Sequence, residues 1–444
     1  MFNVMPAKLM HSKVMRIESG IEIEMMVIMM VNGNIGAGVA VAGGATGAVR
    51  RVCLSGDEWT LEGGRVRVPH TWNAADATDG KDVDVRKSGH DSVSSESYAR
   101  KVGAYVRALP DPKPGVRSFV ICEGVSSVAE VRINGKTVGC HQGAFTSFGF
   151  EITSALRPSG NRLEIVADNT YDPDVPPISG DFVLFGGVYR NVWLLETPQV
   201  CVSPLVWGGP GVTLDADPDT GRVTAKVTVL GGTNEVQRLA FGRPKLWSPE
   251  TPHLYTARIV VRQGGCEDAV EIPFGFRKAE FRGDGFYLNG VKRQIRGVCR
   301  HQDREGKGWA VTAEDEAEDV AWMKRMGADG VRTAHYPQSE AFFDLCDRRG
   351  LMAWTELPLV ADRAAGYDWG TRYRVRRASM DWTLRDMASY GLDGATYNGT
   401  REYLACHITN GTENLPALYV ANLQLRARNP SHCDYKPSMP ALKL

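Results

Sequence analysis

The chain of 444 residues is long enough for about three domains of roughly 150 residues each, which excludes a peptide or a toxin-like scaffold. Its 52 basic and 52 acidic residues balance, and its nine histidines are spread along the chain, so no basic stripe indicates nucleic acid as a partner. Hydrophobic residues at 43% and charged residues at 23% are typical of a folded protein, and 48 glycines with 23 prolines favour a turn-rich β protein.

We expect residues 1–50 to be a disordered or foreign leader, because they are rich in methionine and glycine and match no domain pattern. The apolar stretch Met25–Val31 is too short to cross a bilayer, and the glycine-rich stretch Gly33–Gly47 follows it, so no membrane span is predicted. A secretory signal is the alternative, since Lys13 and Arg16 precede the apolar stretch. Acidic residues interrupt this basic flank, namely Glu18, Glu22 and Glu24, and the compartment stays open between cytoplasm and periplasm.

Nine cysteines are scattered from Cys53 to Cys433 without a Cys-x-x-Cys pair or a Cys/His run at zinc-ligand spacing. The sequence therefore predicts neither a metal site nor a disulfide framework, and it predicts no cofactor.

Residues 51–200 are predicted to form an all-β domain that ends near Thr197. Polar and apolar residues alternate with the period of a half-buried strand in four stretches: Arg117–Ile121, Ala129–Ile133, Arg162–Ala167 and Asn191–Leu194. Between two strand-like stretches, Asn134-Gly135 predicts a tight hairpin, because a type I′ turn needs positive φ at both central residues.

A second β domain is expected over residues 201–281, with alternation in Arg222–Val229 and Leu254–Val261. About 80 residues are few for a complete sandwich, so we expect a shortened one in which one or more strands are missing.

Residues 282–360 change from a period of two to one of 3.6 after a second hairpin signal at Asn289-Gly290, which indicates a new domain. Strands are expected at Arg293–Val298, Gly330–Thr333 and Leu351–Thr355. The helix over 312–326 begins at Thr312 and stops at Gly327, and a second helix runs from the Ser339 cap to Gly350. This β-α-β-α-β order predicts parallel strands and the beginning of a (β/α) barrel.

Polar residues follow the three predicted strands: Arg300 and His301, then Arg332 and His335, then Glu356. The carboxyl ends of barrel strands form the face on which active sites are built. Each residue alone is also compatible with a structural loop or ion-pair role. Their recurrence at the same end of successive strands favours a site.

Several ordered motifs give the chain a family resemblance. They are Val68-Pro69-His70-Thr71-Trp72-Asn73, Phe185-Gly186-Gly187-Val188-Tyr189-Arg190, Leu246-Trp247-Ser248-Pro249-Glu250, Phe274-Gly275-Phe276-Arg277, Arg296-Gly297-Val298-Cys299-Arg300-His301-Gln302-Asp303 and Val331-Arg332-Thr333-Ala334-His335-Tyr336-Pro337. Over about residues 55–360 the sequence resembles glycoside hydrolase family 2, which includes β-galactosidases, β-glucuronidases and β-mannosidases.

The resemblance implies a multidomain β and α/β protein, with a jelly-roll sugar-binding domain, a short immunoglobulin-like sandwich and the start of a (β/α)8 TIM barrel. It implies a retaining glycosidase site, in which His301 and His335 contact sugar hydroxyls and Arg332 lies beside the nucleophile. Glu356 resembles an acidic residue of the family after the third strand, and Asp181 resembles a jelly-roll aspartate that reaches the barrel mouth in β-galactosidases.

The catalytic carboxylates are not found in the sequence. The family supplies the acid/base residue in an Asn-Glu pair after the fourth strand, whereas the only such pair here is Asn234-Glu235, inside the second β domain. About 90 residues follow Glu356, but five further β/α units of about 30 residues need about 150. Residues 361–444 look unlike the family, with turn-like Asn398-Gly399-Thr400 and several late prolines.

Two functions remain open. The first is retaining hydrolysis of terminal β-galactosides or related sugars by family, with this chain expected to be a catalytically incomplete fragment. The second is a noncatalytic carbohydrate-binding or remnant protein. Carbohydrate is the expected partner in both cases, nucleic acid and membrane are not, and the sugar and the oligomeric state stay open.

Overall fold

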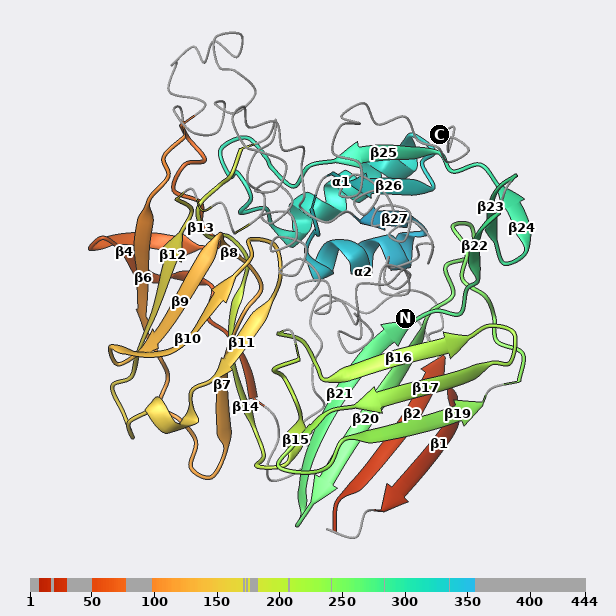
Figure 1. Ribbon diagram of the computed structural model, residues 1–444, viewed down its shortest axis with the longest axis horizontal. Helices are drawn as coiled ribbons and strands as arrows, with labels where there is room; N and C mark the ends of the chain where they lie inside the picture. The colour runs from red at the N-terminus through yellow and green to blue at the C-terminus, as the bar shows by residue number, and fades with distance from the viewer. Residues whose placement is uncertain are drawn as a thin grey trace, which may run out of the picture.

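The structure is a computed structural model that describes residues 8–16, 20–29, 50–76, 98–170, 172, 175, 183–206, 208–240, 242–282, 284–334 and 336–355. Two β-sandwiches and a mixed α/β unit lie side by side, with the α/β unit above the gap between the sandwiches in the view of Figure 1. The residues expected to form an unrelated tail, 361–444, lie outside the described ranges.

The first sandwich consists of a six-stranded sheet in the order β10-β9-β12-β6-β4-β5, a four-stranded sheet in the order β11-β7-β14-β3, and the short pair β13-β8. The strands are β3 (Arg50–Cys53), β4 (Gly56–Leu61), β5 (Gly64–Val68), β6 (Val102–Ala108), β7 (Arg117–Cys122), β8 (Val125–Ser126), β9 (Val128–Ile133), β10 (Lys136–Gln142), β11 (Phe148–Glu151), β12 (Arg162–Asp168), β13 (Gly187–Val188) and β14 (Val192–Thr197), with one 3-10 turn at Thr153–Ala155. All four strands expected from alternation are present.

Alternation produces the core of this sandwich. Along β12, Leu163, Ile165 and Ala167 are fully buried, while the intervening residues are partly or fully exposed. The hairpin between β9 and β10 turns at Asn134 and Gly135 with φ of 54° and 83°, which confirms the predicted turn.

The second sandwich has a three-stranded sheet, β16-β17-β19, facing a four-stranded sheet, β1-β2-β20-β21, and the short pair β15-β18 (Figure 1). The strands are β1 (Lys8–Arg16), β2 (Glu22–Met29), β15 (Cys201–Val202), β16 (Val212–Asp217), β17 (Arg222–Val227), β18 (Val229–Leu230), β19 (Glu235–Ala240), β20 (Tyr255–Gln263) and β21 (Cys266–Phe274).

The expected disorder of the leader is therefore wrong for Lys8–Arg16 and Glu22–Met29, which form a hairpin in this sandwich. The physical reason is an alternation that the methionine-rich composition concealed: Ile21, Ile23, Met25 and Val27 are buried and the residues between them are not. The strands expected to be missing from the second domain are supplied by the leader.

A three-stranded meander joins the second sandwich to the α/β unit, with β22 (Ala279–Arg282), β23 (Gly285–Leu288) and β24 (Val291–Arg293). Its turn at Asn289 and Gly290 has φ of 54° and 79°, as the second hairpin signal predicts. Strand β22 crosses the domain boundary expected between residues 281 and 282.

The α/β unit has three parallel strands, β25 (Gly297–Arg300), β26 (Gly330–Thr333) and β27 (Met352–Thr355), connected by α1 (Ala313–Arg325) and α2 (Glu340–Arg349). Thr312 and Asp315 form a reciprocal capping box at α1, and Ser339 caps α2, which ends at Gly350 with a φ of 69°.

The first strand was expected at Arg293–Val298 and is displaced toward the carboxyl terminus. Arg293 belongs to the β24 hairpin, where it pairs with Phe286, so the parallel strand begins only at Gly297. Arg300 is consequently the last residue of β25 and does not lie in the following loop. Among the described residues, no helix is both long and apolar enough to cross a membrane.

Candidate functional site

The carboxyl ends of β25 and β26 place Cys299 and Arg332 opposite each other. The two residues are in register on the parallel strands, and Arg332 Nη1 lies 3.7 Å from Cys299 Sγ. Their neighbours Val298 and Val331 pack on the helices, so the alternation of the strands turns Arg332 to the side of the sheet away from the helices. In a barrel that side is the interior, where Arg332 is predicted to act.

Arg300 has a structural role instead. Its guanidinium is buried, lies 4.3 Å from the centre of the Phe342 ring, and forms an ion pair of 2.8 Å with Asp319 on α1. It also donates a hydrogen bond to Gln338 Oε1. Arg300 therefore fastens β25 to both helices and does not face the predicted site.

His301 follows β25 and is exposed. Its ring meets the Tyr336 ring edge-on, with centroids 6.1 Å apart. Tyr336, on the loop after β26, is fully buried, and its hydroxyl oxygen accepts a hydrogen bond of 3.4 Å from the backbone N–H of Gln302. The loops after β25 and β26 are thus tied to each other by one tyrosine.

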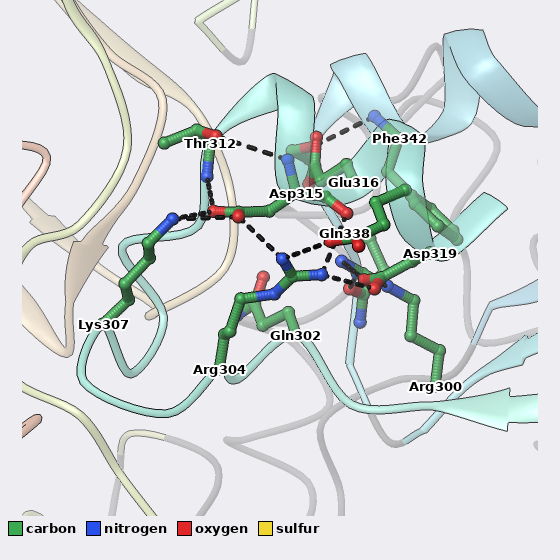
Figure 2. A network of polar contacts seen from close by, with 12 residues as sticks. Arg300, Gln302, Arg304, Lys307, Thr312, Asp315, Glu316, Asp319, Gln338 and Phe342 are labelled. Carbon is green, nitrogen blue, oxygen red and sulfur yellow. Dashed lines mark hydrogen bonds and ion pairs between the residues drawn. The ribbon is translucent and has the colours of Figure 1, made fainter. Parts of the chain in front are cut away.

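Figure 2 shows the polar network that holds the β25–α1 loop in place. Arg304 donates hydrogen bonds to Asp315 at 2.8 Å, Glu318 at 2.7 Å and Asp319 at 2.9 Å, and Lys307 forms an ion pair with Asp315 at 2.7 Å. Burial raises the pKa of Asp315, but hydrogen bonds from Lys307 and the Thr312 backbone outweigh this effect, and the pKa is lowered. Asp315 is therefore an anion that anchors the loop.

A buried carboxyl links the two helices in the same region. Glu316 on α1 accepts a hydrogen bond of 2.6 Å from the hydroxyl of Ser339, the cap of α2. Burial raises the pKa of Glu316, although this hydrogen bond and the positive charge of Arg300 oppose the shift. The contact connects the starts of the helices and lies on the helix side of the strands.

The first sandwich contacts both loops through Arg190. This arginine is buried, and its guanidinium donates to Gln302 Oε1 at 2.9 Å and to the Pro337 carbonyl at 3.2 Å. Thr71 adds a hydrogen bond of 2.7 Å to the Lys307 carbonyl. The first sandwich thereby fixes the loops that follow β25 and β26.

An aromatic cluster fills the same interface. Phe145 of the first sandwich stacks on Tyr336 with centroids 4.3 Å apart. The centroid of the Trp309 ring lies 4.9 Å from that of Phe145, 5.7 Å from that of Phe185 and 5.3 Å from that of Tyr189, all in the first sandwich. The sequence motif that contains Phe185 and Arg190 carried the family resemblance, but no contact with the barrel loops was predicted for it. The motif itself is the sequence feature that could have pointed to this interface.

Asp181, His335 and Glu356 lie outside the described residues, so of the five predicted site residues the structure places His301 and Arg332. Both are at the carboxyl ends of neighbouring strands, as predicted. Within the described ranges, no group of three or more histidine, cysteine or acidic side chains is arranged to hold a metal ion.

Three family models match the chain in order. "Glycosyl hydrolase 2 galactose-binding domain-like" matches residues 98–176, "Glycosyl hydrolases family 2" matches residues 212–277, and "Glycosyl hydrolases family 2, TIM barrel domain" matches residues 279–369. This chain belongs to glycoside hydrolase family 2. Its architecture is a galactose-binding-like domain, an immunoglobulin-like domain and the first part of a TIM barrel, as the resemblance implied.

Curated family-2 relatives include enzymes with two activities. A β-glucuronidase of Bacteroides fragilis is 37% identical over 339 residues, covering 67% of this chain and 47% of the relative. A β-galactosidase of Thermoanaerobacter pseudethanolicus is 31% identical and covers 55% of this chain and 37% of the relative. The chain spans less than half the length of these relatives.

Solved structures show the same family-2 fold. A β-glucuronidase of Bacteroides uniformis superposes with a TM-score of 0.63 at 27% identity, covering 78% of this chain and 46% of that one. A putative β-galactosidase of Bacteroides fragilis superposes with a TM-score of 0.65 at 26% identity, covering 86% and 63%.

Proposed function

We propose that this chain binds terminal β-glycosides at the barrel end formed by β25 and β26, as part of a family-2 glycosidase site. The observation that carries the proposal is that Arg332, within β26, and His301, just after β25, lie at the ends of neighbouring strands, next to loops held by Tyr336 and Arg190. Rigid loops suit sugar recognition, because hydroxyl groups are selected by hydrogen-bonding groups in fixed positions.

In this proposal the predicted site residues divide into two roles. His301, His335 and Asp181 would bind sugar hydroxyls, while Arg332 would keep a neighbouring carboxylate such as Glu356 ionised. β-Galactosides and β-glucuronides are the proposed ligand classes, supported by the activities named for the relatives.

We further propose that the site binds without turnover. Retaining hydrolysis needs two carboxyl groups about 5–5.5 Å apart, one as acid/base and one as nucleophile. Glu235, in the only Asn-Glu pair of the sequence, is the first residue of β19 in the second sandwich and belongs to a different domain from Arg332. Histidine and arginine can orient a sugar but cannot replace that pair.

Binding and turnover are measured separately on the purified chain. Isothermal titration with nitrophenyl β-galactoside and β-glucuronide should detect binding of at least one glycoside, and Arg332→Met should weaken it about tenfold or more by removing a charged contact. Arg325→Met, on a residue whose guanidinium lies over Trp322 on α1, is the matched control and should bind like the parent. Binding of neither glycoside would contradict the proposal.

Release of nitrophenol should stay far below about 1 s⁻¹, the range of ordinary enzymes. Glu356→Gln should then leave the rate of nitrophenol release unchanged. Turnover in the enzyme range that Glu356→Gln abolishes would show that the chain does contain a carboxylate pair.

A further inference from the structure

The N-terminal hairpin fills a place in the second sandwich that its sequence neighbours leave open. Without β1 and β2, the sheet that faces β16-β17-β19 would consist of β20 and β21 alone. A two-stranded sheet is too narrow to cover the three-stranded sheet opposite it, and an isolated two-stranded hairpin is only marginally stable in water. The edge of β20 and the inner face of the opposite sheet therefore form a site for added strands.

The hairpin pairs with the edge of β20 along a continuous backbone ladder. Strand β2 runs antiparallel to β20 in unbroken register, from Glu22 opposite Arg262 to Met29 opposite Tyr255. The two strands are far apart along the chain, since Glu24 and Arg262 are 238 positions apart. The contact thus resembles a peptide that adds a strand to a sheet edge, a mode in which the main chain supplies affinity and alternate side chains supply specificity.

The inward side chains of β2 determine which strand fits. Ile23, Met25 and Val27 are fully buried, and they lie opposite the buried Val261, Ile259 and Ala257 of β20. These six residues belong to one apolar core with Val223 and Val227 of the opposite sheet. A slip by one residue would turn the whole apolar set outward.

The outward face adds a charge preference. Glu24 forms an ion pair of 2.8 Å with Arg262, which also binds Glu267 on β21 at 2.8 Å. Arg258 lies on the same strand, where it faces Glu267 and Glu271 at 3.5 Å each. A strand that docks on β20 therefore needs apolar residues inward, and an acidic residue outward adds a smaller contribution.

One buried polar residue lies in the core that the hairpin helps to cover. Gln237 on β19 is 1% exposed and lies on the same face as the buried Leu239, and β19 is in contact with β1. Within the described part of the chain, neither its Oε1 nor its Nε2 has a hydrogen-bond partner. A buried amide without a partner costs free energy, so this core is less stable than a fully apolar one would be.

We propose that the β20 edge is a strand-acceptor site for an amphipathic β-hairpin, and that it accepts residues 8–29 from a second copy of this chain when its own hairpin is displaced. The inference does not depend on the proposed sugar site, because it concerns the second sandwich, whereas that site is proposed at the ends of β25 and β26.

The test removes the hairpin from β20 in the full chain and then supplies the same segment as a separate peptide. In the full-length variant carrying Ile23→Asp and Met25→Asp, two charges would have to enter the apolar core, so the hairpin should leave β20. A fluorescent peptide of residues 8–29 should then bind to this variant, as followed by polarisation, and the same peptide carrying both substitutions should bind at least 100-fold more weakly.

A peptide with Glu24→Gln is the matched control and should lose no more than about fivefold, since the ion pair with Arg262 is partly exposed. Dimers of the parent chain that dissociate on adding the peptide would also support the exchange. Equal binding of the native and doubly substituted peptides would overturn the proposal.

A second measurement guards against a variant that fails to fold. In the parent chain, hydrogen exchange in β2 (Glu22–Met29) should be slowed as strongly as in β20 (Tyr255–Gln263), because each strand holds the other's amides. Exchange in β2 at the rate of the free peptide would refute the docking itself, whatever the variant does.

Discussion

Replacing Arg190 by methionine should loosen the interface between the first sandwich and the barrel loops. The guanidinium donates hydrogen bonds to the Phe145 carbonyl at 2.8 Å, Gln302 Oε1 at 2.9 Å, the Pro337 carbonyl at 3.2 Å and the Glu123 carbonyl at 3.4 Å. Hydrogen bonds to a charged group contribute about 1.5–3 kcal/mol each, and the acceptors left behind are buried. Counting only the two bonds that cross to the loops, to Gln302 and Pro337, the loss is about 3–6 kcal/mol.

Hydrogen exchange is the suitable assay, because the chain has several domains and a single melting temperature would average over them. Amides of residues 301–310 and 336–339 should exchange about 100-fold faster or more, given that each 1.4 kcal/mol is a factor of ten. Arg190→Lys should recover part of the protection, since lysine keeps the charge but not the forked geometry.

Arg67→Met is the control for this experiment. Arg67 is 70% exposed and its ion pair with Asp57, at 2.7 Å, lies in solvent, so its loss should change stability by less than about 1 kcal/mol. If Arg190→Met exchanges in these loops no faster than Arg67→Met, the sandwich does not hold the loops and the reasoning fails.

Three further predictions concern single sites. Burial raises the pKa of Asp268 to about 6, although the Val202 backbone N–H donates to it. Because the folded-state pKa exceeds the ordinary value, the contribution of Asp268 to stability should be fully present below about pH 4 and be lost as the pH rises through 6. Asp268→Asn should remove this part of the pH dependence and be about 2 kcal/mol more stable than the parent at pH 8 in urea titrations. A parallel pH profile for both proteins would contradict this. Gly187→Ala should unfold at lower urea, because φ is 130° and the added Cβ would lie 2.5 Å from the His70 carbonyl; an unchanged midpoint would refute the strain. Thr312→Ala should cost about 1 kcal/mol through loss of the α1 cap, and no change would argue against the capping box.

Local signals in the sequence predicted the secondary structure around the site well. Thr312, Ser339 and Gly350 bound the two helices where the cap rules place them, and Asn134-Gly135 turns where the hairpin rule requires. These features depend on residues within a few positions of one another, so the sequence states them directly. The end-of-strand position of Arg332 follows from the same kind of reasoning.

The roles of two arginines needed the tertiary structure. Arg300 and Arg332 both follow strand-like stretches, yet one packs between the helices and the other faces away from them. The extent of the strand decides this: β25 is shifted to Gly297–Arg300, so Arg300 lies inside the strand and points to the helix side, as Val298 does two residues earlier. The sequence around Arg300 does not contain the β24 pairing of Arg293 that causes the shift.

Amino-acid sequence alone determined the family, the order of the domains, the helix boundaries and the alternation that builds each sheet. Only the tertiary structure decided that Glu22–Met29 pairs with Tyr255–Gln263 and that Arg190 reaches Gln302 and Pro337. Partners more than a hundred positions apart are chosen by which apolar face needs covering and which buried acceptor needs a donor. Those requirements depend on the folded arrangement of the chain, so no short stretch of the sequence is sufficient to predict the partners.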